Sequence, residues 1–119
     1  MIYKAEIPIK MPSLNEYISE CRRNKFAGAK FKRYYEDVIT LYTRHLPHIK
    51  KPVKIQFVWV EASWRRDLDN VSFGKKFILD ALVKQGILMD DGQRFVVGLA
   101  DTFQHDKFYA VKIYLEEVQ

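Results

Sequence analysis

The chain has only one cysteine and no long apolar run, and these two features exclude several classes of protein. Cys21 alone cannot form an intramolecular disulfide, and no cysteine pair near the three histidines gives zinc-finger spacing. Uncharged apolar runs such as Phe57 to Val60 are far shorter than the roughly 20 residues of a membrane helix. Charged residues within Met1 to Lys10 also interrupt any secretory signal. We therefore expect a soluble cytoplasmic protein with no membrane partner, in which any metal is held by oxygen ligands.

The sequence also lacks the motifs of several enzyme classes. No serine or cysteine is placed to form a triad with a histidine, so covalent catalysis is unsupported. A P-loop is absent. A calcium loop that starts at Asp67 is excluded, because Val71, Ser72 and Ile78 stand where it needs an oxygen ligand, a glycine and a glutamate.

What is present describes one small domain. A chain of 119 residues is long enough for one hydrophobic core and too short for two, so we expect a single domain over residues 1–119. Its composition, 48% hydrophobic and 29% charged, offers enough apolar surface to offset the chain entropy lost on folding.

Positive charge is concentrated in one window. Between Ser19 and Tyr35 there are six basic residues against one acid, Glu20, whereas the rest of the chain is balanced. The window also contains Phe26 and Phe31, and basic residues mixed with aromatics suit phosphate contact with base stacking. A solvated helix face is the alternative. We expect DNA to be bound by Arg22, Arg23, Lys25, Lys30, Lys32 and Arg33.

The apolar pattern predicts the order strand, helix, strand, helix, strand, strand. Alternation of apolar and polar residues predicts strands, and apolar residues every three or four positions predict helices. The strands are expected at Tyr3–Ile9, Val53–Val60, Phe95–Phe103 and Phe108–Leu115, and the helices at Ala29–Leu46 and from Asp69 or Asn70 to Gly86.

The same pattern predicts the fold class, which is α+β with the helices packed on one mixed sheet. The distal half of Val53–Val60 is apolar on both faces, so this strand should be central in the sheet. Met11–Gly28 has no sustained period and is expected to be a long basic loop, with at most a short helical turn at Asn15–Glu20.

The segment Arg65-Arg66-Asp67-Leu68-Asp69-Asn70 is the most unusual stretch of the chain. If it continues extended from the preceding strand, Asp67 and Asp69 project to the same side, and two adjacent carboxylates favour a cation between them. Mg²⁺ and Mn²⁺ prefer such oxygen ligands, while Arg65 and Arg66 could contact a phosphate. The alternative is a helix N-terminus, where aspartates cap amides.

Two further features lie after this segment. Asp90-Asp91-Gly92 is by default a turn, and it meets Asp67 only if the chain after Gly86 runs back along the helix. A lysine at 75 or 76 could hold a scissile phosphate. However, Lys76, Asp80 and Lys84 are spaced by four, which is also typical of a solvated ion-pair stripe.

The combination of RRDLDN, a helix containing KKFILDAL and the turn DDGQ resembles the RusA family of Holliday junction resolvases. The likeness covers about Arg65 to Gln93, and Pro12, Asn15 and Tyr17 are similar to the family's segment near the N-terminus. It implies a magnesium-dependent endonuclease, often prophage-encoded, that acts as a homodimer and makes paired cuts across four-way DNA junctions in recombination and repair.

The resemblance also implies the site. The family's metal ligands fall on Asp67, Asp69 and Asp91, and its catalytic lysine falls on Lys76. This chain has about three more residues between DLDN and the lysine, which is close to one helical turn and leaves the face of Lys76 unchanged. Lys75 stays a rival for that role.

We therefore expect Mg²⁺, or alternatively Mn²⁺, held by these aspartates to hydrolyse the backbone of branched DNA. Two alternatives stay open. One is a non-catalytic protein that binds branched DNA and whose acids only cap a helix. The other is a nuclease for flaps or other branched DNA.

Overall fold

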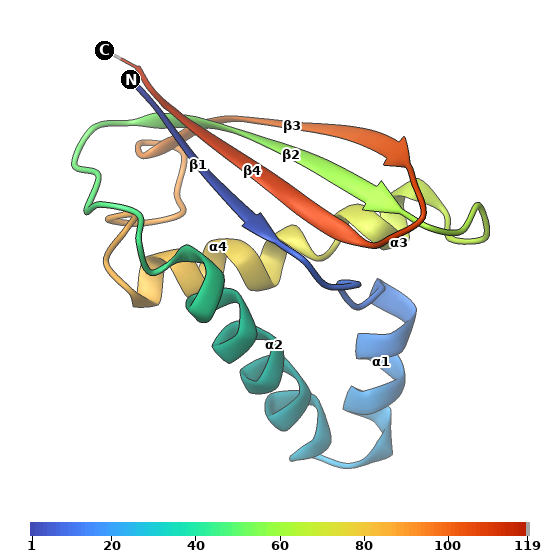
Figure 1. The fold of residues 1–119 in the computed structure, drawn as a ribbon. Helices are drawn as coiled ribbons and strands as arrows, with labels where there is room; N and C mark the ends of the chain where they lie inside the picture. The colour runs from blue at the N-terminus through green and yellow to red at the C-terminus, as the bar shows by residue number, and fades with distance from the viewer. Residues whose placement is uncertain (119) are drawn as a thin grey trace.

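A computed structural model describes residues 1–118 and confirms the predicted α+β class, with helices on one face of a single mixed sheet (Figure 1). None of the helices within this range is both long enough and apolar enough to span a bilayer. The elements in chain order are β1 (Ile2–Ile7), α1 (Leu14–Arg23), α2 (Ala27–Thr43), β2 (Val53–Glu61), α3 (Leu68–Ser72), α4 (Lys75–Lys84), β3 (Val96–His105) and β4 (Ala110–Glu117).

The sheet has the strand order β1-β4-β2-β3. β2 pairs antiparallel with β4 on one side and parallel with β3 on the other, so the prediction that it is internal is confirmed. Its alternate residues Ile55, Phe57 and Trp59 are buried on the face that the helices cover. β2 therefore spans the middle of the sheet, and what precedes and follows it lies at opposite ends of the molecule.

The prediction of a long loop at Met11–Gly28 is wrong, because α1 occupies Leu14–Arg23. A capping box starts this helix: Ser13 Oγ accepts from the Glu16 amide at 3.1 Å, and Glu16 Oε1 accepts from the Ser13 amide at 3.2 Å. The Ser-x-x-Glu spacing was visible in the sequence. It was missed because α1 is short and mostly polar, and none of its residues is fully buried.

The second predicted helix is divided into α3 and α4 at Phe73 and Gly74. Here the Lys76 amide donates to the Phe73 carbonyl and the Phe77 amide to the Gly74 carbonyl, so the turn is tightened. A Cβ on Gly74 would lie 3.2 Å from both Met11 Cβ and the ring of Trp59. The break thus lets the chain pass close to the sheet.

Phe77 is the centre of an aromatic cluster that joins the helices. Its ring is fully buried, and the rings around it are Tyr17 of α1, Phe31 and Tyr35 of α2, and Phe73 between α3 and α4. The ring centroids lie 5.2 to 6.4 Å from that of Phe77, the range in which aromatic pairs attract. One side chain of α4 therefore holds both α1 and α2.

Replacing Phe77 by alanine should lower the free energy of unfolding by about 3–5 kcal/mol, because it removes a buried ring and leaves a cavity. Phe26 is 70% exposed, and the same substitution there should change stability by less than about 0.5 kcal/mol. Urea unfolding of both variants measures the difference. Equal midpoints for Phe77→Ala and the wild type would show that the cluster does not hold the helices together.

Candidate functional site

Asp67 and Asp69 lie where the chain leaves β2 and enters α3. The segment does not continue the strand as the extended arrangement would require: Asp67 is the N-cap residue of α3, and Asp69 is in its first turn. The Asp67 side chain makes no capping hydrogen bond, whereas Asp69 Oδ1 accepts from the Asn70 amide at 3.0 Å. Both residues are exposed, so two carboxylates that are two residues apart in sequence face solvent.

Asp69 borders a hollow of about 540 Å³ that also takes residues from α1, α2 and α4. Three lysines reach it, namely Lys32, Lys75 and Lys76, and its apolar lining includes Tyr17 and Phe73. One acidic and three basic residues therefore line one concave surface. This is a place where a cation and a phosphate could both be bound.

The structure separates the roles of the two neighbouring lysines. Lys75 Nζ bonds Asp101 of β3, and the other carboxylate oxygen of Asp101 accepts from Trp59 Nε1 at 2.8 Å. The Lys75 side chain is 22% exposed, while that of Lys76 is 57% exposed. Lys75 is thus a half-buried link between α4 and the sheet, and Lys76 is the one whose ammonium is more open to a ligand.

Asp80 binds lysines from two helices. Its carboxylate lies 2.7 Å from Lys32 Nζ of α2 and 3.2 Å from Lys76 Nζ of its own helix. Burial alone raises the pKa of Asp80, but the hydrogen bonds from Lys32 and Lys76 outweigh it, and the net pKa is lowered. The hydrogen bond to Asp80 in turn raises the pKa of Lys32. The predicted stripe to Lys84 is not formed, since Lys84 binds Glu36 at 2.6 Å.

Asp91 lies at the opposite end of β2 from Asp67 and Asp69 (Figure 1). α4 ends at Lys84 with Gln85 as its C-cap residue, and Gly86, which follows, has the positive φ of 75° expected of its predicted capping role. The chain then packs against Ile49 and enters β3 beside the start of β2, rather than running back along the helix. With nine residues, β2 spans roughly 26 Å.

One chain therefore does not bring the three predicted ligands together. Within residues 1–118, no group of three or more Asp, Glu, His or Cys side chains is close enough to hold a metal ion. Asp90 and Asp91 are both exposed, and Asp90 Oδ1 accepts from the Asp91 amide at 2.8 Å, as in a turn.

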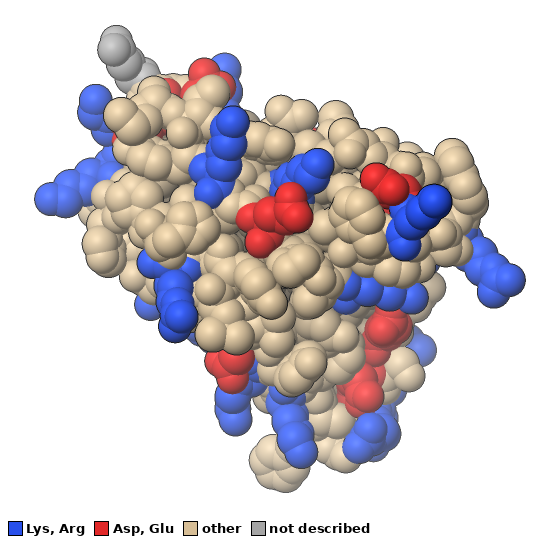
Figure 2. Space-filling model, in the orientation of Figure 1, with Lys and Arg blue, Asp and Glu red and all other residues tan. Residues whose placement is uncertain are grey.

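The basic window forms the hairpin of α1 and α2. Figure 2 shows Lys and Arg side chains around the end of the molecule that these two helices form. Some of them have internal partners: Arg23 lies 3.2 Å from Glu20, and Lys32 is bound by Asp80. The exposed members of the window are Arg22, Arg23, Lys25, Lys30 and Arg33.

Of the two arginines before Asp67, one is exposed and the other has partners within the chain. Arg65 is exposed, whereas the guanidinium of Arg66 donates to both oxygens of Glu61, at 2.9 and 2.7 Å, and to the Met11 carbonyl at 2.7 Å. Sequence reasoning missed Glu61 and Asp101 because each is an isolated acid, Glu61 at the end of β2 and Asp101 in the middle of β3. The signal that could have found them is that such acids are rarely buried without a basic partner.

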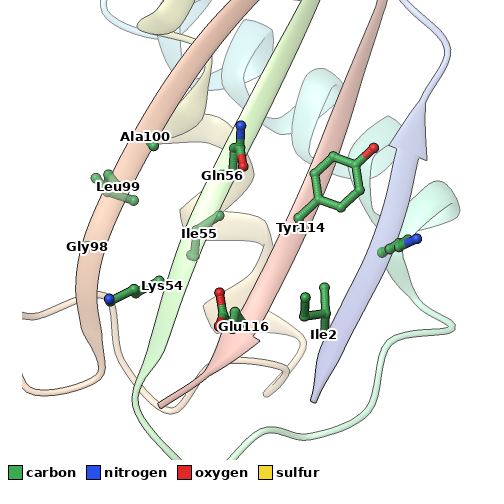
Figure 3. A pocket seen from close by; sticks show the side chains of 10 residues that line it. Ile2, Lys54, Ile55, Gln56, Gly98, Leu99, Ala100, Tyr114 and Glu116 are labelled. Atoms are coloured by element: carbon green, nitrogen blue, oxygen red, sulfur yellow. The ribbon is translucent and has the colours of Figure 1, made fainter.

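A second hollow, of about 520 Å³, lies on the face of the sheet that is opposite to the helices (Figure 3). Its polar side chains are Lys4, Lys54, Gln56, Tyr114 and Glu116. Glu116 is its one acid, and none of the predicted site residues reaches it. The hollow beside Asp69 is therefore the better candidate for phosphate chemistry.

No protein-family model matches the chain, and no curated protein matches it. The resemblance to the RusA family and the metal set that it implies thus remain predictions.

Replacing Asp80 by asparagine should lower stability by roughly 1–3 kcal/mol at neutral pH, because two charged hydrogen bonds are weakened. The native pKa of Asp80 is lowered, so its contribution is present above its ordinary value of 3.8 and is lost as the pH falls through the native value. The two proteins should thus converge at acidic pH. Asp37, an exposed aspartate of α2, is the control, and a constant difference across pH would contradict the ion pairing.

Proposed function

We propose that the protein is a Mg²⁺-dependent endonuclease that resolves four-way DNA junctions, as the resemblance to the RusA family implies. One observation carries the proposal. The exposed pair Asp67 and Asp69 has no Lys or Arg within ion-pair distance among residues 1–118, whereas the lysines that line the hollow beside Asp69 are bound by Asp80 and Asp101. Two exposed carboxylates that are two residues apart and have no basic partner leave negative charge that a bound cation would compensate.

The chemistry of these donors fits the ion. Carboxylate oxygens that leave positions open for water suit Mg²⁺, with Mn²⁺ as the alternative. When bound, such an ion activates water and polarises a phosphate. Lys76 is exposed beside Asp69, so its ammonium could steady the charge that develops on the phosphate. The hydrogen bond to Asp80 limits where that ammonium can lie.

Binding of DNA would rest on the hairpin of α1 and α2 together with Arg65. The cations of the hairpin are exposed at the end of the molecule that α1 and α2 form, and salt-dependent attraction to phosphates is what such a distribution provides. Arg66 is left out of this set because Glu61 and Met11 use its donors.

A homodimer is part of the proposal for two reasons. A junction needs two cuts, and a two-fold dimer supplies two sites. In addition, Asp91 cannot reach Asp67 and Asp69 of its own chain across β2. If Asp91 is a ligand of the same ion, a second copy has to bring it.

The failure of one chain to gather three acids favours a second candidate, a non-catalytic protein that binds branched DNA. It would use the same exposed cations and show the same salt dependence. The two candidates differ only in whether junctions are cut in Mg²⁺.

Replacing Asp69 by asparagine should abolish cutting and leave junction binding intact, because the change removes a charged ligand and keeps the size of the side chain. The measurement is cleavage of a synthetic four-way junction in Mg²⁺, with EDTA as the blank and a linear duplex as the substrate control. Asp37→Asn is the matched variant and should cut like the wild type. Cutting by Asp69→Asn in Mg²⁺ would exclude the mechanism, and a wild type that binds but never cuts would favour the second candidate.

Mixing two inactive variants tests the origin of Asp91. In a dimer of one Asp69→Asn chain and one Asp91→Asn chain, one site carries both substitutions and the other carries neither if Asp91 comes from the partner. Such mixed dimers should nick junctions although each variant alone is inactive. If every site uses the acids of a single chain, the mixture stays inactive, and gel analysis of one labelled strand at a time separates these results.

A further inference from the structure

Trp64 is unusually exposed for an aromatic residue. It lies in the loop between β2 and α3, three residues before Asp67, and 82% of its surface faces solvent. One face of the indole is stacked on the imidazole of His105, with ring centroids 3.3 Å apart and planes 7° apart. Since His105 covers one face and the residue is so exposed, the opposite face of the indole is open.

The segments that carry the two rings are both fixed to the end of β2. His105 ends β3 in register with Glu61, and the Asp106 amide donates to the Glu61 carbonyl at 3.1 Å. The loop that carries Trp64 is closed by a hydrogen bond from the Arg65 amide to Ser63 Oγ at 3.1 Å and by the ion pair between Arg66 and Glu61. A ring that is already fixed loses little conformational freedom when a ligand stacks on it.

The charged groups around the rings identify the class of ligand. Arg65 directly follows Trp64 and Lys107 lies two residues after His105; both are exposed cations, and Asp106 is the exposed acid beside Lys107. Asp67 follows Arg66 and belongs to the proposed metal site. A planar ring with phosphates on either side of it, which is a nucleotide in a single strand, matches an open indole flanked by cations.

We propose that the open face of Trp64, backed by His105, is a stacking site for an unpaired nucleobase. The inference rests on the proposed function in taking DNA as the substrate. It adds that a base must leave its duplex at the end of the molecule where Asp67 and Asp69 lie, so DNA with unpaired bases near the cut is preferred over continuous duplex.

The experiment measures binding of two DNA molecules, a single-stranded oligothymidylate of about 12 nucleotides and a duplex of about 12 base pairs. Both are measured in EDTA, where no cutting occurs. Trp64→Ala should weaken binding of the single strand roughly 5- to 150-fold, because stacking of one base on an aromatic ring contributes that much. Binding of the duplex should change little. Trp64→Phe, which keeps a ring, should retain most of the affinity. Tyr42→Ala, which removes an exposed ring of α2, is the matched control.

Two further readouts distinguish stacking from a general effect. The dependence of affinity on salt should have the same slope in Trp64→Ala and the wild type, because no phosphate contact is removed. The single strand should also quench tryptophan fluorescence in the wild type and not in Trp64→Phe, since the remaining Trp59 is only 1% exposed.

Several results would overturn the inference: unchanged affinity of Trp64→Ala for the single strand, an equal loss on the duplex, or no binding of the single strand by the wild type. A loss of dimer mass in Trp64→Ala would show instead that a second copy covers the indole. Failure of the proposed function is a different result, namely absence of junction cutting in Mg²⁺, and it leaves these EDTA measurements unaffected.

Discussion

The ion pair between Arg66 and Glu61 fixes the end of the molecule at which the candidate site lies. The guanidinium meets both carboxylate oxygens of Glu61 in a planar fork, and its third donor reaches the Met11 carbonyl. The two side chains are 13% and 8% exposed. Removing either partner would leave a buried charge without compensation, at a cost of roughly 3–5 kcal/mol. The ion pair therefore anchors the loop after β2 to the end of the strand.

The ion pair of Arg66 also restricts the positions of two nearby residues. Trp64 precedes Arg66 by two residues and Asp67 follows it directly, so the position of the guanidinium determines where the indole and the first carboxylate can lie. Through Met11 it also places the segment that leads into α1 and the capping box at Ser13. A side chain that was expected to contact phosphate thus connects β2, α1 and the loop that carries the acids.

The sequence predicted most of the fold because the apolar pattern of each long element is set by one buried face. The division of the second helix at Gly74 was not predictable, since it depends on how closely the chain approaches Trp59 and Met11. Asp67 and Asp69 could be singled out from charge repulsion between neighbours. Asp91 could not be placed, because spacing along the sequence does not show which end of β2 the turn before β3 returns to. In the structure it returns to the start of β2, whereas Asp67 and Asp69 follow the end of β2.

The charges around the hollow divide into a paired and an unpaired group. Lys84, Glu36, Lys32, Asp80 and Lys76 form a chain of alternating charge across α2 and α4, and it ends on the exposed Lys76. This chain holds one more cation than acids, whereas Asp67 and Asp69 carry two negative charges that no Lys or Arg in residues 1–118 balances. An anionic and a cationic group beside one hollow complement a divalent ion and a phosphate respectively. Under the proposed function, a bound ion would compensate the anionic group and a DNA phosphate the cationic one, so each ligand would strengthen binding of the other.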